Sequence, residues 1–279
     1  MTDKPINLYY MKGGNNFGDI LSKHIVEAVS GRIATFSKIQ KADLVSTGSL
    51  LSGVQKKRFK RILTSGFKTL HVWGTGIIEP GGALSTRNLH IHAVRGQTSR
   101  LRLGLESNAV PLGDPGLLCN RLFPRNLNPS GPIVATPHLH DTESELWINQ
   151  VRTVVKSDVV VHNLRAPVQE TLDVIGGASL VITSAMHPLI AAHSYGVPVV
   201  WMNVGKKYVG GGTYKFADYY SVFGPDATTK PVMIDFSSRD ISVITQSRLE
   251  DLADSSFINR TQLETIQDGL IKSFPREYI

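Results

Sequence analysis

One histidine of this chain lies where an α/β enzyme would place a proton donor. An apolar, β-branched run at 180–183 is followed by Ser184 and then by His187. Pro188 suits the first turn of a helix and Gly196 its end, so the segment predicts the order strand, histidine, helix, strand. Imidazole exchanges a proton near neutral pH, and open α/β sheets bind ligands at the carboxyl ends of their strands. We therefore expect His187 to be a catalytic acid, with Ser184 beside it in a substrate site.

The position of His187 at a helix start also predicts its charge. Unpaired amides and the helix dipole disfavour a fixed imidazolium there. A bound dianionic substrate would restore the proton, so the acid would be present mainly when the substrate is bound. The alternative is a structural histidine, and His193 on the same predicted helix is expected to be of that kind.

Other polar residues that end predicted strands or open predicted helices are candidates for binding an anionic substrate. The glycine-rich turn at 13–19 would bring backbone amides to an anion at a helix amino terminus, although Asp19 could instead cap that helix. The basic, glycine-rich segment at 206–216 suits a cover over a phosphate or a plain connector. A surface position is the alternative for Arg95. The candidate substrate-binding residues are Asn16, Asp19, Arg95, His138, Arg165, Ser184 and Lys215.

Two kinds of site are not expected. His138, His140 and His162, with Asp141, could suggest zinc, but their spacing matches no helical metal motif, so we predict no metal. The turn at 13–18 is not Gly-x-Gly-x-x-Gly, and no acidic residue ends the second predicted strand, so dinucleotide binding is not favoured.

The composition is that of a globular protein of a reducing compartment. The 279 residues are 41% hydrophobic and 19% charged, which excludes a disordered chain. Cys119 is the single cysteine, so no internal disulfide can form. The amino terminus lacks an apolar core of signal-peptide type, and no stretch approaches the roughly 18 apolar residues that span a bilayer. The cytoplasm is the expected location.

The positive charge is concentrated in the first half of the chain. The net charge is +7, but residues 1–125 carry +11 and residues 126–279 carry −4. The densest basic run is 56–61, which is either a solvated helix face or an attraction for an acidic polymer, a lipid surface or nucleic acid. Nucleic acid is not expected, because no nucleic-acid module is recognisable. Peripheral contact with the inner face of the membrane stays open.

Short apolar runs alternate with helical patterns, which predicts parallel sheets covered on both faces. The predicted strands are 6–10, 32–36, 44–47, 70–73, 91–94, 133–136, 159–162, 180–183 and 199–203. A proline-rich break at 123–132 separates two units of similar size. We predict an α/β protein with two Rossmann-like domains facing a cleft, at 1–125 and 126–245. Helices at 246–279 would follow, with packing against the first domain as one option.

Seven short motifs, in their order along residues 6 to 224, resemble the polysaccharide pyruvyl transferase family. They are Gly-Asn-Asn-Phe-Gly-Asp (14–19), Gly-Ser-Leu-Leu (48–51), Trp-Gly-Thr-Gly (73–76), Val-Arg-Gly (94–96), Gly-Asp-Pro-Gly (113–116), Met-His-Pro-Leu-Ile (186–190) and Phe-Ala-Asp-Tyr-Tyr (216–220). The resemblance implies a fold like that of two-domain (GT-B-like) glycosyltransferases. It also implies transfer of pyruvate from phosphoenolpyruvate to a bacterial exopolysaccharide or its precursor as a cyclic ketal, with His187 as proton donor and no cofactor.

The resemblance further implies a saccharide acceptor, which the basic first domain would hold in anionic, lipid-linked form, while the second domain would hold the donor. One departure stands out, because many relatives have arginine two residues before the histidine, where this chain has Ala185. The donor's phosphate or carboxylate must then meet another cation: Arg165, Arg95 or Lys215. The substitution resembles the branch tied to acidic exopolysaccharide assembly.

Three other functions stay open at this point. The same architecture could transfer a sugar from a nucleotide-sugar, and a non-catalytic relative could bind glycan only, which Ala185 makes worth retaining. A dinucleotide-dependent oxidoreductase ranks third because the binding fingerprint is missing.

Overall fold

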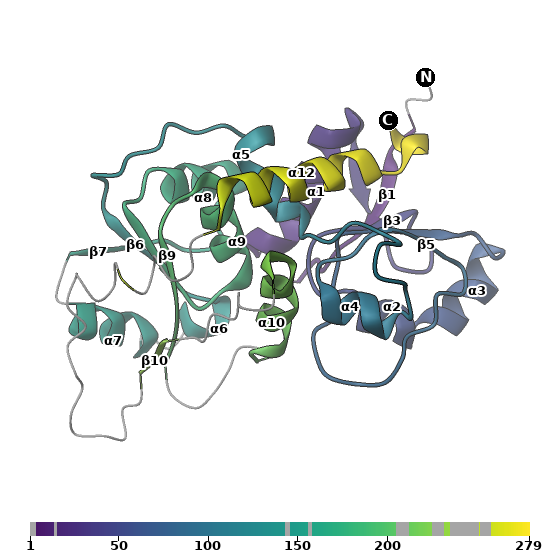
Figure 1. The fold of residues 1–279 in the computed structure, drawn as a ribbon, viewed down its shortest axis with the longest axis horizontal. Helices are drawn as coiled ribbons and strands as arrows, with labels where there is room; N and C mark the ends of the chain where they lie inside the picture. Colours follow the sequence, from purple (N-terminus) through teal and green to yellow (C-terminus); the bar gives the residue numbers. More distant parts are fainter. Residues whose placement is uncertain are drawn as a thin grey trace.

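Two parallel five-stranded sheets form the frame of the protein (Figure 1). The computed structural model describes residues 4–13, 16–142, 146–155, 158–204, 212–224, 232–234, 251 and 258–279. The strand orders are β2-β1-β3-β4-β5 and β10-β9-β8-β6-β7, and neighbouring strands pair in parallel. Parallel pairing requires crossover connections, and most of these are helices here.

The nine strands expected from the sequence are all present, with ends within two residues of the prediction. The strands are β1 (Ile6–Tyr9), β2 (Ala34–Phe36), β3 (Leu44–Val45), β4 (Leu70–Trp73), β5 (Leu89–Ala93), β6 (Ile133–Thr136), β7 (Val159–Val161), β8 (Leu180–Thr183), β9 (Val199–Val204) and β10 (Val232–Ile234). Strand β10 was not anticipated, because three residues are too few to show a pattern.

Helices connect and follow the strands. They are α1 (Phe17–Ser30), α2 (Leu51–Lys56), α3 (Arg58–Ser65), α4 (Gln97–Arg102), α5 (Cys119–Leu122), α6 (Leu139–Thr142), α7 (Leu146–Val155), α8 (Val168–Gly176), α9 (Met186–Tyr195), α10 (Tyr214–Tyr220) and α12 (Arg260–Ser273), with 3₁₀ turns η1 (Pro115–Leu118), η2 (Ser221–Phe223) and η3 (Arg276–Tyr278). Gly196 ends α9 with a left-handed φ of 72°, as its place in the sequence predicts.

The two sheets share one apolar core. Helix α1 follows β1 of the first sheet, yet it packs against α8 and α9, which belong to the second. The same cluster of buried residues includes Leu8 of β1 and Val181 of β8. The sheets are formed by segments on either side of residue 125, but their helices interlock, so the domain boundaries at 125 and 245 stay predictions.

Helix α12 lies against the first sheet at the end of the chain. The Trp73 indole nitrogen donates to the Leu270 carbonyl at 2.9 Å, and the Trp73 ring meets Phe274 edge to face at 4.8 Å between centroids. Residues almost 200 positions apart are thereby held together. Among the described residues, no helix combines the length and the apolar character needed to cross a bilayer.

Candidate active site

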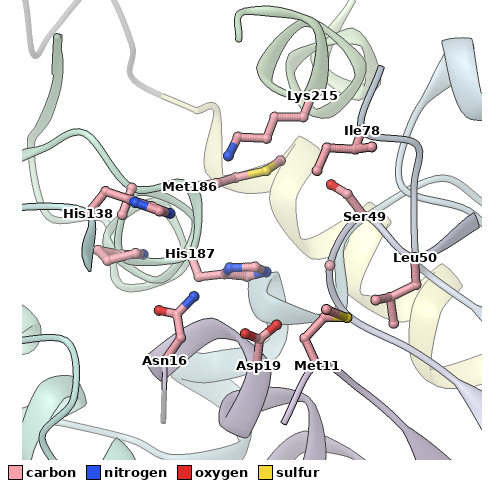
Figure 2. Close-up of a pocket in the computed structure, with 13 residues that line it drawn as sticks. Met11, Asn16, Asp19, Ser49, Leu50, Ile78, His138, Met186, His187 and Lys215 are labelled. Atoms are coloured by element: carbon pink, nitrogen blue, oxygen red, sulfur yellow. The ribbon is translucent and has the colours of Figure 1, made fainter. Parts of the chain in front are cut away.

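A pocket lies where strands of both sheets end at their carboxyl ends (Figure 2). Segments following β1, β3 and β4 contribute from the first sheet, and segments following β6 and β8 from the second. The pocket encloses about 260 Å³, and its lining consists of Met11, Asn16, Asp19, Gly48, Ser49, Leu50, Ile78, His138, Ala185, Met186, His187, Pro188 and Lys215. Its place at the strand ends is where open α/β sheets bind ligands.

His187 enters this pocket from the first turn of α9 (Figure 2). Its side chain is partly buried, and its Nε2 is closed to solvent with no hydrogen-bond partner among the described residues. Burial, followed by the positive charges of Lys215 and Arg95, lowers the pKa of His187 to about 3. A buried polar atom without a partner destabilises a fold by about 1–3 kcal/mol, and this one belongs to a ring that lines a pocket.

Gly18 makes room for that ring. A Cβ at Gly18 would overlap the His187 imidazole. Helix α1 of the first sheet therefore approaches the histidine of the second sheet so closely that no side chain fits between them. The motif at 14–19 thus has one glycine whose role is to seat His187.

Two opposite charges line the pocket on different elements. Asp19 lies in the first turn of α1, and Lys215 lies at the start of α10 with 8% of its surface exposed. Burial is the main cause of both pKa shifts: it raises the pKa of Asp19 to about 6 and lowers that of Lys215 to about 8. Asn16 also lines the pocket and donates to the Asp19 side chain, which favours the ionised carboxylate.

Arg95 is completely buried behind the pocket wall instead of lining it. Its Nε donates to Asp218 Oδ2 at 3.0 Å, one terminal nitrogen donates to the Ser49 hydroxyl at 2.6 Å, and the other donates to the Ile77 carbonyl at 2.6 Å. These bonds engage each nitrogen of the guanidinium. Arg95 therefore positions Ser49 and ties strand β5 to helix α10, and its positive charge acts on His187 through space.

Two motif glycines let this Arg95–Asp218 pair form. A Cβ at Gly76 would press on the Arg95 guanidinium, and a Cβ at Gly96 would overlap the Asp218 carbonyl oxygen. Asp218 also accepts from the Ser99 amide at 2.8 Å and from the Ser99 hydroxyl at 2.7 Å. The pair thus joins two sequence motifs 123 residues apart.

Ser184 and His138 are linked through the backbone. The Ser184 hydroxyl accepts from the His138 amide at 2.9 Å and donates to the Asp141 carboxylate at 2.6 Å. Ser184 is thus buried beneath the lining, where it holds the turn after β6, and the His138 side chain faces the pocket (Figure 2).

Of the three cations considered for the donor, the structure brings only Lys215 into the described lining. Arg165 is exposed on the surface outside the lining, and Arg95 is buried and held by Asp218, so neither lines this pocket. The segment 205–211 of the basic loop lies outside the described residues. Asp218 and Gly18 were missed as site-forming residues, although both belong to motifs that the sequence displays.

A second, larger groove borders the first pocket at Met11. It encloses about 950 Å³ between the ends of β1 and β2, the segments that follow them, and helix α3 with its N-cap residue Lys57. Its described lining carries five lysines and no carboxylate: Lys12, Lys38, Lys41, Lys57 and Lys60. Tyr9, Tyr10 and Phe36 give the groove aromatic surfaces, with Lys12 lying 5.2 Å from the Phe36 ring centre. Its chemistry suits an anionic, ring-bearing molecule.

Comparison with known proteins identifies the family of this chain. The sequence model of the family described as polysaccharide pyruvyl transferase matches residues 3–206. The match covers more than half of the chain, so the protein belongs to the polysaccharide pyruvyl transferase family. The motifs that form the pocket, from Asn16 to His187, lie inside the matched segment.

The individual proteins that this chain resembles are uncharacterized. An uncharacterized protein of Acanthamoeba polyphaga mimivirus is 27% identical over 172 residues, which are 58% of this chain. The alignment also spans only 58% of that curated relative's length. A crystal structure of an uncharacterized protein of Klebsiella pneumoniae aligns with 82% of this chain and 92% of its own, at 13% identity and a TM-score of 0.43.

Proposed function

We propose that the protein transfers pyruvate from phosphoenolpyruvate to a sugar of a polysaccharide or its lipid-linked precursor, forming a cyclic ketal on a GT-B-like, two-domain frame. The single observation that carries this proposal is the unpartnered Nε2 of His187 in a pocket whose described lining holds one lysine. A small, dianionic substrate would satisfy both groups at once.

The donor would lie between Lys215 and the amino terminus of α9. The first residues of that helix line the pocket, and unpaired amides at a helix amino terminus bind phosphate and carboxylate groups. Lys215 would add a charge-assisted contact. The volume supports a small donor, since about 260 Å³ is below the roughly 300–1,000 Å³ of most ligand pockets.

The reaction would begin with proton transfer from His187 to the methylene carbon of phosphoenolpyruvate. The carbon–carbon double bond supplies the electron pair, so the adjacent carbon becomes oxocarbenium-like. A sugar hydroxyl forms a bond to that carbon and gives its proton to His187, which is neutral after the first step. A second hydroxyl then forms another bond there as the carbon–oxygen bond to phosphate breaks, and its proton leaves with the phosphate. Positioning of both hydroxyls would supply much of the rate.

The electrostatics of the free site fit such a donor-dependent acid. His187 is neutral without substrate because burial and nearby cations lower its pKa. A phosphate and a carboxylate placed beside the ring would favour the imidazolium. Asp19, whose pKa burial raises to about 6, would accept a hydrogen bond from the attacking hydroxyl.

The acceptor would approach along the lysine-lined groove. The groove meets the catalytic pocket at Met11, so a saccharide lying in it would reach toward His187. Lysines attract carboxylates and phosphates, and aromatic faces pack against sugar rings. An acidic glycan or a lipid pyrophosphate carrier carries both kinds of group.

Helix α3 would bring the protein to the membrane that holds such a carrier. Phe59, Leu63 and Phe67 have 72%, 83% and 64% of their surface exposed. Lys57 and Lys60, beside them in sequence, also line the groove. Large exposed apolar side chains next to lysines are typical of a surface that inserts among anionic lipids.

Liposome binding tests the membrane contact. Vesicles containing anionic lipid should retain the protein at low salt and release it at high salt. Exchanging Phe59 and Leu63 together for Ser should weaken retention at least about 10-fold, because the variant has lost the two apolar side chains that would move from water into the lipid. The matched control is Leu101→Ser, which alters an exposed leucine on α4. Absence of retention at low salt would remove this part of the proposal.

Mass spectrometry tests the reaction itself. The protein would be incubated with phosphoenolpyruvate and candidate lipid-linked oligosaccharides, and the products examined for a pyruvyl group and free phosphate. Failure to release phosphate with any acceptor would favour a non-catalytic, glycan-binding relative. Protection from thermal unfolding by a nucleoside diphosphate, but not by phosphoenolpyruvate, would favour a nucleotide-sugar glycosyltransferase.

A further inference from the structure

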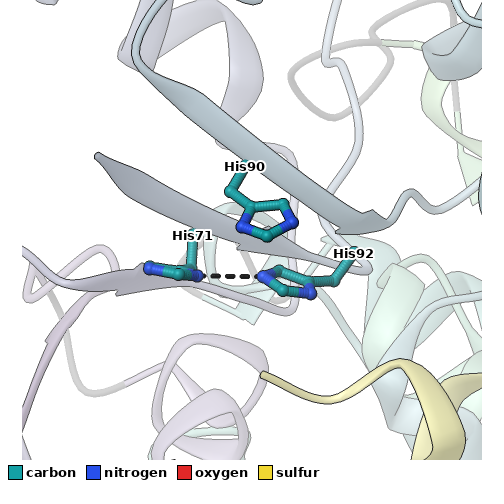
Figure 3. A group of neighbouring side chains, drawn as sticks. All are labelled: His71, His90 and His92. Carbon is teal, nitrogen blue, oxygen red and sulfur yellow. Dashed lines mark hydrogen bonds between the residues drawn. The ribbon is translucent and has the colours of Figure 1, made fainter. Parts of the chain in front are cut away.

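Three histidines gather on two neighbouring strands of the first sheet, away from the lining of the pocket (Figure 3). His71 lies on β4, and His90 and His92 lie on β5. Side chains two residues apart on a strand share a face, and the register sets His71 opposite His90. The three rings therefore meet on one face of the sheet.

The ring nitrogens converge on a small volume. His71 Nδ1 lies 2.9 Å from His92 Nε2, and one nitrogen from each of the three rings lies within 4.8 Å of the other two. Two imidazole nitrogens bound to one tetrahedral zinc ion, at about 2.0–2.1 Å from it, are roughly 3.3 Å apart. The observed separation is close to that value, so a small rotation of the rings would let them bind one ion.

A carboxylate lies beside one ring of this set. Glu277, in the 3₁₀ turn after α12, places its Oε1 3.0 Å from His71 Nδ1. The main-chain carbonyl of Glu277 accepts from Arg32 at 3.1 Å, which holds the turn in place. A movement of the Glu277 side chain toward the three converging nitrogens would add an oxygen donor, and zinc binds imidazole and carboxylate donors in four-coordinate sites.

We propose that His71, His90, His92 and Glu277 bind one divalent transition-metal ion, with Zn²⁺ the best fit and Co²⁺ and Ni²⁺ as substitutes. Nitrogen donors favour these ions over Mg²⁺ and Ca²⁺, which prefer oxygen. A bound ion would tie the end of the chain to strands β4 and β5.

Metal titration of the full chain tests this site independently of the proposed reaction. Protein stripped with a chelator and returned to chelator-free buffer would be titrated with Zn²⁺ by calorimetry and with Co²⁺ by visible absorption. We expect one equivalent to bind, with the intense absorption of tetrahedral cobalt, and the temperature of unfolding to rise with added Zn²⁺.

Two variants and one control assign the ligands. His90→Ala removes an exposed ring and should lower affinity at least about 100-fold, as expected when a direct ligand is lost. Glu277→Gln should weaken binding and change the cobalt spectrum, because an oxygen ligand is replaced. His24→Ala, which removes a histidine of α1 outside the cluster, should bind as tightly as the native chain. Absence of stoichiometric binding, or equal affinity in His90→Ala, would overturn the site.

Discussion

The two ends of helix α9 carry the same residue type in opposite situations. His193, near the carboxyl end, is buried, shares a 2.8 Å hydrogen bond with the Tyr219 hydroxyl and stacks on the Tyr219 ring at 5.9 Å between centroids. His187, at the amino end, has a closed-off nitrogen with no described partner and a pocket beside it. His193 is held by a neighbouring side chain inside the fold, whereas His187 faces a pocket that a ligand can enter.

The contrast shows how to separate structural from functional histidines. Residue type does not distinguish them, because both are histidines of one helix. The difference is in their surroundings: His193 bonds to Tyr219, whereas His187 lines a pocket and lies near the positive charges of Lys215 and Arg95. A histidine in a pocket, with its pKa shifted by burial and by specific charges, is a candidate for function.

The largest predicted difference between His187 and His193 is in catalysis. His187→Gln should reduce turnover about 100- to 10,000-fold, the usual contribution of a general acid, while the protein stays folded. His193→Gln should keep turnover within a few-fold of native, because it touches no substrate. The measurement is phosphate release with one acceptor for both variants. Similar rates for the two would erase the distinction between the ends of the helix.

A substitution outside α9 should also affect His187. Gly18→Ala would normally favour a helix, but here the added methyl group overlaps the His187 ring and must displace it. Misplacement of about 1 Å costs roughly 100-fold in rate, and we expect a loss of that order. The matched control is Gly53→Ala in α2, where the nearest atom to the new methyl group is the Tyr9 hydroxyl at 4.0 Å. If Gly18→Ala retains native activity, Gly18 does not seat the catalytic ring.

The pH dependence of donor capture sharpens the role of the charges around His187. Because burial lowers the pKa of Lys215 to about 8, this side chain loses its proton, and its hold on an anionic donor, as the pH rises through that value. In kcat/KM for phosphoenolpyruvate, which reports the free enzyme, we expect a decline above about pH 8. Lys215→Arg stays charged and should remove the decline. Persistence of the decline in Lys215→Arg would assign it to another group.

The smallest predicted effect is on stability, and it should be larger for the His193 variant than for the His187 variant. His193→Phe leaves the Tyr219 hydroxyl without its hydrogen bond and should lower the free energy of unfolding by about 1–3 kcal/mol. His187→Gln removes no hydrogen bond of its described Nε2 and should change it by less than about 1 kcal/mol. Denaturant titrations of both variants would measure the difference. A reversed order of stability would mean that His187 is the structural histidine.

Much of this arrangement could be predicted from the sequence, because it depends on local patterns. The segment through β8, His187 and α9 follows from an apolar run, a proline and a glycine, and the structure reproduces it. The choice among three cations could not be made in that way. Arg95, Arg165 and Lys215 all lie near the ends or starts of elements, and Arg95 lies behind the pocket wall because Asp218, 123 residues later, pairs with it.

Contacts between residues far apart in the sequence could not be predicted from the sequence alone. His90 and His92 alternate visibly, but their meeting with His71 depends on the register of β4 and β5, and Glu277 arrives from the end of the chain. The role of Gly18 likewise depends on the approach of α1 to α9, because α1 follows a strand of the first sheet and α9 follows a strand of the second. Long-range packing decides such contacts, and local propensity carries no signal of them.

The charge of the His187 ring, with and without donor, tests the central claim most directly. Nitrogen NMR of protein labelled at histidine, assigned by comparison with His187→Gln, reports whether each ring is neutral or protonated. At pH 7 we predict a neutral ring at position 187 in the free protein, since burial and nearby cations lower its pKa to about 3, and a protonated ring once phosphoenolpyruvate is bound. A ring that stays neutral with the donor bound, or that is already protonated without it, would contradict the account.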